Sequence, residues 1–190
     1  VKDLSFSVVA AEVKKIMGPN GSGKSTSVNL ISGTLPPTSG EIRFSGANVT
    51  SLSVMERVPL GLARTFQTTS VFAEFSVREQ VLTACHARYR SSASGSVFRT
   101  ASARREQSAQ RAKVEEILAF VGLANVADEL TSAISSAQQR LLMIATALAT
   151  EPRLVLLDEP AAGMVAKERK NLAMLIQRIR ERGTAVLVIE

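Results

Sequence analysis

The stretch "GPNGSGKSTS", residues 18–27, constrains the fold of this chain more than any other feature. Gly18, Gly23, Lys24 and Ser25 fit the spacing GxxxxGK[ST], between the strand-like run "VKKIM" and the helical run "STSVNLISG". Glycines let the backbone curl so that successive N–H groups point at phosphate oxygens, and a following helix adds its positive N-terminal end. The sequence therefore predicts a phosphate-binding loop between a strand and a helix, rather than a glycine-rich turn that matches by chance.

The side chains of this loop suit a nucleoside triphosphate such as ATP, bound together with Mg²⁺. Lys24 supplies a mobile positive charge for the β and γ phosphates, and Thr26 can add a hydrogen bond to phosphate. Ser25 offers a hydroxyl to Mg²⁺, which prefers hard oxygen ligands. The residues that we expect to bind the nucleotide are Asn20, Gly21, Ser22, Gly23, Lys24, Ser25 and Thr26.

A second motif, "RLVLLDEP", places two carboxylates at the end of an apolar run. The run from Leu154 to Leu157 is continuous, as expected for a parallel strand that is buried on both faces. Ligands of open α/β sheets bind at the carboxyl ends of the strands. Asp158 is therefore predicted to hold Mg²⁺ through its water shell, and Glu159 to orient or deprotonate the attacking water. The alternative is a polar strand end before a turn at Pro160.

Elsewhere the hydrophobic spacing predicts helices and one further strand. The arginine-rich stretch 90–111 is predicted to be a surface loop leading into a helix, and "TAVLVI" at 184–189 a strand. We expect an α/β fold, in which a parallel sheet is flanked by helices and a helical subdomain is inserted between the two motifs. The positions that recur at helical spacing are Val114, Ile117, Leu118 and Val121, followed later by Leu172, Leu175, Ile176 and Ile179.

Composition restricts the setting and the partners. The single cysteine, Cys85, cannot form an internal disulfide, and no apolar run approaches the roughly 18 residues needed to span a bilayer. These features favour a cytosolic setting. The net charge of +6 comes from scattered arginines, and aromatic residues make up only 4%, so a solvated basic surface is favoured over a nucleic-acid site. The chain starts at Val1 within a strand-like run, which suggests truncation at its front.

These motifs and their surroundings resemble the ATP-binding cassette family, and specifically the ATPase subunits of branched-chain amino acid importers. "GPNGSGKST" and "LVLLDEPAAGM" match the family's two nucleotide motifs, and "GLARTFQTTSVFAEFSVREQVLTACHAR" is similar to its glutamine-loop region. "ISSAQQRLLMIATALATEP" falls where the family has its signature helix. The resemblance covers nearly the whole chain and implies a P-loop NTPase fold of the ABC ATPase type, truncated at both ends.

The resemblance also implies roles for residues that spacing alone does not single out. Gln67 falls in the glutamine loop, which in the family touches the metal and the attacking water. The segment from Ser70 to Val81 borders the groove that receives a helix of the membrane permease. Ser135, Ala137 and Gln138 stand on the signature, which caps the γ-phosphate bound by the opposite subunit of a head-to-tail dimer, whether homodimer or heterodimer. Ser135 and Gln138 also read simply as a capping box that opens a helix.

Several positions depart from the family pattern. Ala137 replaces the signature glycine, so a methyl group stands where the backbone approaches phosphate. Lys14 and Lys15 lie in the strand before the phosphate loop, where buried lysines without partners would be costly. Val165 and Ala166 replace a polar residue and a proline, where the family's subunits meet. His86 is the only histidine, and its position is not that of the family's histidine after the last strand.

We therefore predict one nucleotide-binding domain over residues 1–190, with an ATPase core at 1–75 and 151–190 and a helical subdomain at 76–150. Its expected function is to bind and hydrolyse MgATP at the cytoplasmic face of the inner membrane, driving solute uptake through a partner permease. Branched-chain amino acids are the expected solute. One rival is a nucleotide-binding fragment or scaffold that does not hydrolyse ATP, and another is a soluble cassette ATPase that acts on nucleic acid or ribosomes.

Overall fold

The computed structural model describes residues 3–19, 21–65, 72–86 and 101–190, and side chains from residue 107 onward in the last segment. Contacts divide the chain into two units. Residues 1–67 and 152–190 form the first unit, and residues 68–151 form the second. The phosphate loop and the carboxylate pair both belong to the first unit.

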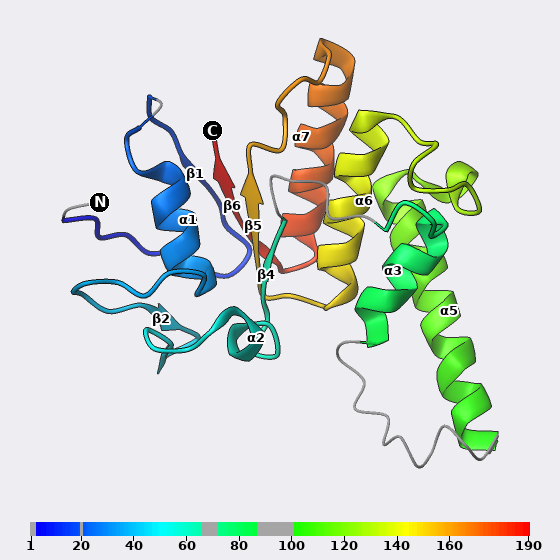
Figure 1. The fold of residues 1–190 in the computed structure, drawn as a ribbon, viewed down its shortest axis with the longest axis horizontal. Helices are drawn as coiled ribbons and strands as arrows, with labels where there is room; N and C mark the ends of the chain where they lie inside the picture. Colours follow the sequence, from blue (N-terminus) through cyan, green and yellow to red (C-terminus); the bar gives the residue numbers. More distant parts are fainter. Residues whose placement is uncertain (1–2, 20, 66–71, 87–100) are drawn as a thin grey trace. The chain divides into compact units, whose positions relative to one another are not determined.

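A four-stranded parallel sheet organises the first unit (Figure 1). Its strands are β1 (Val13–Ile16), β6 (Ala185–Ile189), β5 (Leu154–Asp158) and β4 (Leu62–Arg64), in the spatial order β1-β6-β5-β4. All residues of β5 and β6 are buried, because these two strands are central and both of their faces are covered. The predicted parallel sheet flanked by helices is thus confirmed.

Two helices cover this sheet. Val28 of α1 (Lys24–Ser32) packs in one core cluster with alternate residues of the strands, including Leu156 and Leu187. Residues in between, such as Val155 and Val186, point to the opposite face. Helix α7 (Ala166–Glu181) packs against β6 and β1 and buries its predicted apolar face, which consists of Leu172, Leu175, Ile176 and Ile179.

Smaller elements complete the first unit. A hairpin of β2 (Arg43–Phe44) and β3 (Ala47–Asn48) forms a separate antiparallel pair, and a short helix, α2 (Val54–Arg57), follows it. The start of α2 is fixed by Glu56, whose carboxylate accepts from the N–H and from the hydroxyl of Ser53 at 2.8 and 2.6 Å.

Lys14 and Lys15 are partly exposed and paired, so the cost expected of buried lysines without partners does not arise. Both residues belong to β1, which ends the described sheet on one side and is hydrogen-bonded only to β6 within it. Their side chains are 32% and 43% exposed. Lys14 contacts Glu12 at 3.4 Å and donates to the carbonyl of Ser7, while Lys15 pairs with Glu190. The lysines are therefore tolerated because an edge strand leaves their ammonium groups in reach of water and carboxylates.

A fully buried arginine ties α1 to the segment before α2. Arg57 donates through Nη1 to the carbonyls of Leu30 and Ile31 at 2.7 and 2.6 Å, at the C-terminal end of α1. It also donates to the carbonyls of Leu52 and Thr50, at 2.9 and 3.1 Å. Burial lowers the pKa of Arg57, and the four carbonyls compensate for the water that its guanidinium has lost.

Replacing Arg57 with lysine is expected to lower the free energy of unfolding by about 2 kcal/mol, because hydrogen bonds to charged groups are worth about 1.5 to 3 kcal/mol. A lysine keeps the charge but lacks the planar fork that reaches carbonyls on two sides. Urea unfolding followed by circular dichroism measures the change. The matched control is Arg43→Lys on the exposed hairpin, for which we expect less than about 0.5 kcal/mol. Equal losses in the two variants would contradict a special role of Arg57.

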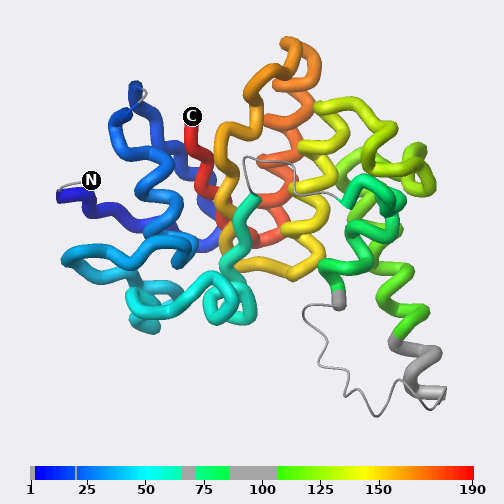
Figure 2. Tube along the Cα trace, viewed as in Figure 1, coloured from blue at the N-terminus to red at the C-terminus, as the bar shows by residue number. Residues whose placement is uncertain are grey.

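Three helices pack together in the second unit: α3 (Val77–His86), α5 (Ala101–Val121) and α6 (Ser136–Ala149) (Figure 2). A short 3₁₀ turn, η1 (Ala124–Val126), follows α5. The predicted apolar face of α5 is confirmed, since Val114, Ile117, Leu118 and Val121 are all at most 5% exposed.

The predicted start of α5 lies too far along the chain. Residues 101–111 are helical, whereas the sequence predicted the end of a surface loop there. This segment is rich in alanine, arginine and glutamine, which are good helix formers even without an apolar stripe. The rest of the predicted loop, up to residue 100, and the side chain of His86 lie outside the described residues.

Candidate nucleotide-binding site

The phosphate loop connects the end of β1 to the start of α1. Gly21 and Gly23 have left-handed backbone conformations, with φ of 81° and 93°, which side-chain-bearing residues rarely adopt. At Gly18 a Cβ atom would lie 2.7 Å from Oγ of Ser22, so only glycine fits there without a shift. Gly23 caps α1 without any side-chain hydrogen bond. The first N–H groups of α1 are thus left for an external acceptor, as an anion site requires.

Lys24, the first residue of α1, reaches back across the loop. Its Nζ donates to the carbonyls of Gly18 and Pro19, at 2.5 and 3.0 Å. These bonds hold the positive charge at the inner side of the loop. Phosphate oxygens that entered the loop would be stronger, charged acceptors for the same ammonium group.

A cavity of about 320 Å³ brings the loop and one motif carboxylate together. This volume falls within the usual range for small-molecule sites. The residues that line the cavity are Gly21, Gly23, Lys24, Ser25, Thr26 and Glu159. The two motifs that the sequence separates by more than a hundred residues therefore meet at one site, because β1 and β5 are parallel strands of one sheet and their carboxyl ends lie at the same edge.

Glu159 follows directly after β5, in a strained turn. Its φ of 46° lies in the left-handed region, and its N–H donates to the carbonyl of Ile189, the last residue of β6, at 2.9 Å. This hydrogen bond holds the backbone while the half-buried side chain faces the cavity. Such strain in a residue with a side chain costs of order 1 kcal/mol, and it is concentrated at functional sites in proteins.

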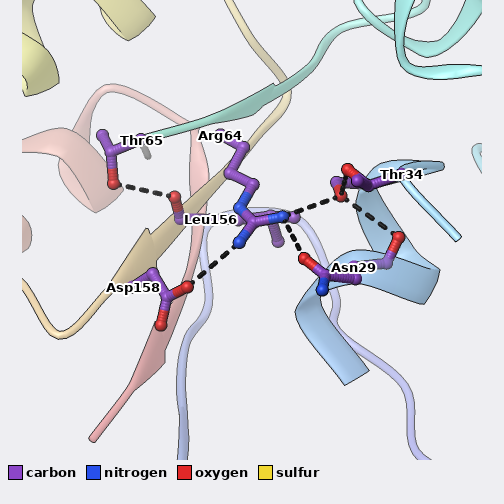
Figure 3. A network of polar contacts seen from close by, with 7 residues as sticks. Asn29, Thr34, Arg64, Thr65, Leu156 and Asp158 are labelled. Atoms are coloured by element: carbon purple, nitrogen blue, oxygen red, sulfur yellow. Dashed lines mark hydrogen bonds and ion pairs between the residues drawn. The ribbon is translucent and has the colours of Figure 1, made fainter. Parts of the chain in front are cut away.

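Asp158, the last residue of β5, is buried and pairs with a cation. Its side chain is 4% exposed, and Oδ2 accepts from Nη2 of Arg64 at 3.1 Å (Figure 3). Arg64 ends β4, and its own side chain is 9% exposed. Nη1 of Arg64 donates to Oδ1 of Asn29 and to Oγ of Ser32, at 2.7 and 3.2 Å, both on α1.

Arg64 is not among the site residues predicted from the sequence, although the alternation of side chains along its strand gives a signal. Side chains alternate between the faces of a strand, so Leu62 and Arg64 share the face that α1 covers. Leu154, Leu156 and Asp158 share the same face on the neighbouring strand. A charged residue at a core-facing position, beside a strand that ends in an aspartate on that face, indicates an ion pair.

The remaining predicted residues fall outside the cavity or outside the described residues. Asn20 and Gln67 belong to the latter group. Ser22 lies in the loop, and its N–H donates to the carbonyl of Pro19 at 3.2 Å. In the second unit, Ser135 and Gln138 form the predicted capping box at the start of α6, and the side chain of Ala137 is partly exposed.

The residues at this site fit a nucleotide-bound Mg²⁺. The cavity offers the hydroxyls of Ser25 and Thr26 next to the open N–H groups of the loop. Asp158, the residue before the cavity-lining Glu159, is a further carboxylate at the end of β5, where it is buried and paired with Arg64. Hydroxyl and carboxylate oxygens are the hard ligands that Mg²⁺ prefers, and Mg²⁺ is commonly held by one or two of them together with phosphate oxygens.

A glycine loop that opens a helix, together with an acidic pair at the end of a parallel strand, defines a P-loop nucleoside triphosphatase. The model of the ABC transporter family matches residues 1–162. The chain therefore belongs to the ABC transporter family, as one of its ATPase cassettes, and the predicted family and ABC ATPase fold are both confirmed.

Known relatives agree with this assignment. The chain is 34% identical to the high-affinity branched-chain amino acid transport ATP-binding protein LivG of Escherichia coli, over 100% of this chain and 75% of that protein. A nucleotide-free ATP-binding cassette from an ABC transporter matches with a TM-score of 0.81 and 31% identity, over 97% of this chain and 72% of that one. A dimeric cassette in a post-hydrolysis state, bound to ADP and phosphate, matches with a TM-score of 0.79 and 25% identity, over 97% and 76% of the two chains.

Proposed function

We propose that this chain is the ATPase subunit of an importer for branched-chain amino acids, in which binding and hydrolysis of MgATP drive uptake through a permease. The observation that carries the proposal is the match to LivG over the whole chain, combined with a cavity that holds both the phosphate loop and Glu159. The two units together would form a single nucleotide-binding domain.

The roles of the site residues follow from their chemistry. Lys24 and the N–H groups at the start of α1 bind the β and γ phosphates, and Thr26 adds a hydroxyl. Ser25 and Asp158 hold Mg²⁺, which neutralises the charge that develops on the phosphates. Glu159 orients or deprotonates the attacking water. In the proposal Gln67 contacts the metal and this water, and Asn20 and Ser22 complete the phosphate loop.

The dimeric relative supports a dimer as the active form, and we propose that its two subunits are arranged head to tail. Ser135, Ala137 and Gln138 would then face the γ-phosphate bound by the other subunit. Their support is the capping box of α6, which fixes the N-terminal end of a 14-residue helix. Ala137 keeps its backbone N–H, so its methyl group would weaken the phosphate contact rather than remove it.

A permease would bind the second unit next to α3. Phe72 and Leu130 are 57% and 50% exposed, and the rings of Phe72 and Phe75 lie 4.9 Å apart. Exposed large apolar side chains of this kind suit a partner protein. None of the described helices is long and apolar enough to cross a membrane. We therefore propose a peripheral subunit, bound to its permease at the cytoplasmic face of the inner membrane.

The rival without hydrolysis loses one of its grounds. Its grounds are Ala137, the strand lysines and the lack of a histidine at the family's position, and of these Lys14 and Lys15 are partly exposed and paired. The related cassette bound to ADP and phosphate also favours a hydrolysing subunit.

Deletion of the gene is expected to abolish high-affinity uptake of labelled leucine, isoleucine and valine, and a wild-type plasmid copy should restore it. A copy with Lys24→Ala should fail to restore uptake, because it lacks the phosphate-binding ammonium group. Uptake of labelled proline serves as the control and should stay constant. If the deletion spares the branched-chain amino acids and lowers uptake of a different solute, the proposed solute is wrong.

A further inference from the structure

We propose that Arg64 is a positioning residue that fixes the relative placement of two Mg²⁺ ligands, Asp158 on β5 and Ser25 on α1. The proposal rests on the Mg²⁺ site of the proposed function and adds a residue to it. Three observations carry it: the burial of the Arg64–Asp158 pair, the second set of bonds from Arg64 to α1, and the face of α1 on which those bonds fall.

Burial makes the carboxylate depend on a cationic partner. The side chain of Asp158 is 4% exposed and that of Arg64 is 9% exposed. Removing one partner of a buried pair leaves an uncompensated charge, which proteins tolerate poorly. Arg64 engages Oδ2, and Figure 3 shows the other carboxylate oxygen pointing away from the guanidinium. A metal can therefore share the carboxylate with Arg64, each cation facing a different oxygen.

The other end of the guanidinium is anchored on α1. Nη1 donates to Oδ1 of Asn29 at 2.7 Å and to Oγ of Ser32 at 3.2 Å. Positions i, i+4 and i+7 lie on one face of a helix. Ser25, Asn29 and Ser32 have this spacing, so Arg64 contacts the face of α1 that carries the metal-ligating hydroxyl at its first turn.

A planar guanidinium suits this bridging task. Its donors lie in a rigid fork, so bonds to β5 on one side and to α1 on the other fix the separation of the two elements. Arg64 itself belongs to β4, which is paired with β5 at Arg64↔Leu156. One side chain thus links three elements of the first unit, and it holds a carboxylate and a hydroxyl in place before the metal arrives.

Loss of this support should weaken Mg²⁺ binding and spare nucleotide binding. The test uses the full-length protein and a fluorescent ATP analogue, whose affinity is measured in EDTA and during a Mg²⁺ titration. For Arg64→Met we expect unchanged affinity in EDTA. The Mg²⁺ concentration at half-maximal signal should rise about 10- to 100-fold, the usual effect of removing a group that supports a metal ligand. The control Arg180→Met, on the exposed side of α7, should leave both values unchanged.

Two further variants separate positioning from a purely structural role. Arg64→Met should cause no additional change in Mg²⁺ requirement when Asp158→Asn is already present, because Arg64 acts through that carboxylate. Asn29→Ala removes the shorter of the two bonds from Arg64 to α1 and leaves the bond to Ser32, so it should raise the Mg²⁺ requirement in the same direction, by a smaller factor. The Asn29→Ala protein also tests the proposal if Arg64→Met does not fold. An unchanged Mg²⁺ requirement of the Asn29→Ala protein would then overturn the role of Arg64.

The outcomes distinguish this inference from the proposed function. If the wild-type protein binds the nucleotide with no dependence on Mg²⁺, the metal site of the proposed function fails. If the wild-type protein depends on Mg²⁺ and Arg64→Met leaves that dependence intact, or weakens binding equally with and without Mg²⁺, only the role of Arg64 fails.

Discussion

Replacing Glu159 with glutamine is expected to lower ATP turnover by about 10²- to 10⁴-fold, the usual contribution of a positioned general base. Glutamine keeps the size of the side chain but cannot accept a proton from water. The backbone N–H that bonds to Ile189 is unaffected, so the turn that presents residue 159 to the cavity should persist. Phosphate release by the full-length dimer measures turnover, and a fluorescent ATP analogue measures affinity.

ATP affinity should be retained in the Glu159→Gln protein, because the substitution removes a negative charge near the phosphates and no phosphate ligand. Glu181→Gln, at the exposed end of α7, is the matched control and should show wild-type turnover. A loss of less than tenfold would show that Glu159 is not the base. If the wild-type protein itself binds ATP and releases no phosphate, the nucleotide-binding rival without hydrolysis is correct.

The sheet and the meeting of the two motifs could be predicted, because both depend on local signals. The apolar run Leu154 to Leu157 predicts a buried parallel strand, and the carboxyl ends of parallel strands share one edge. The cavity accordingly contains both Lys24 and Glu159. Local signals do not give the order of the strands. The run "VKKIM" therefore does not indicate that β1 ends the described sheet and leaves Lys15 partly exposed.

The bonds that Arg64 makes to Asp158 and to α1 could not be predicted either, because they also depend on the order of the strands. Alternation along β4 and β5 places Arg64 and Asp158 on one face only if the two strands are neighbours, and β4 and β5 are separated by the entire second unit in the sequence.

The start of α5 was misplaced for another reason, since residues 101–111 form a helix without an apolar stripe. Gln67, Asn20 and the roles of Ser135, Ala137 and Gln138 stay predictions.

Replacing Lys24 with alanine is expected to abolish the stabilisation of this protein by MgATP. A ligand at a hundredfold excess over its Kd raises the free energy of unfolding by about 2.7 kcal/mol. Lys24 can donate to two phosphates, and each hydrogen bond of a charged group is worth about 1.5 to 3 kcal/mol, so its loss should weaken affinity by about 10²- to 10⁴-fold. At the same MgATP concentration the variant should then gain at most about 0.4 kcal/mol.

Thermal unfolding with and without MgATP measures both gains, and the nucleotide-free Tm separates binding from folding. Lys24 also bonds to the carbonyls of Gly18 and Pro19, so the variant is expected to start from a slightly lower Tm. The comparison therefore concerns the shift that MgATP produces and not the Tm itself. Lys167→Ala on the exposed surface of α7 removes the same charge elsewhere and should retain the full shift. An equal shift in the Lys24→Ala protein would mean that MgATP binds somewhere other than the loop between β1 and α1.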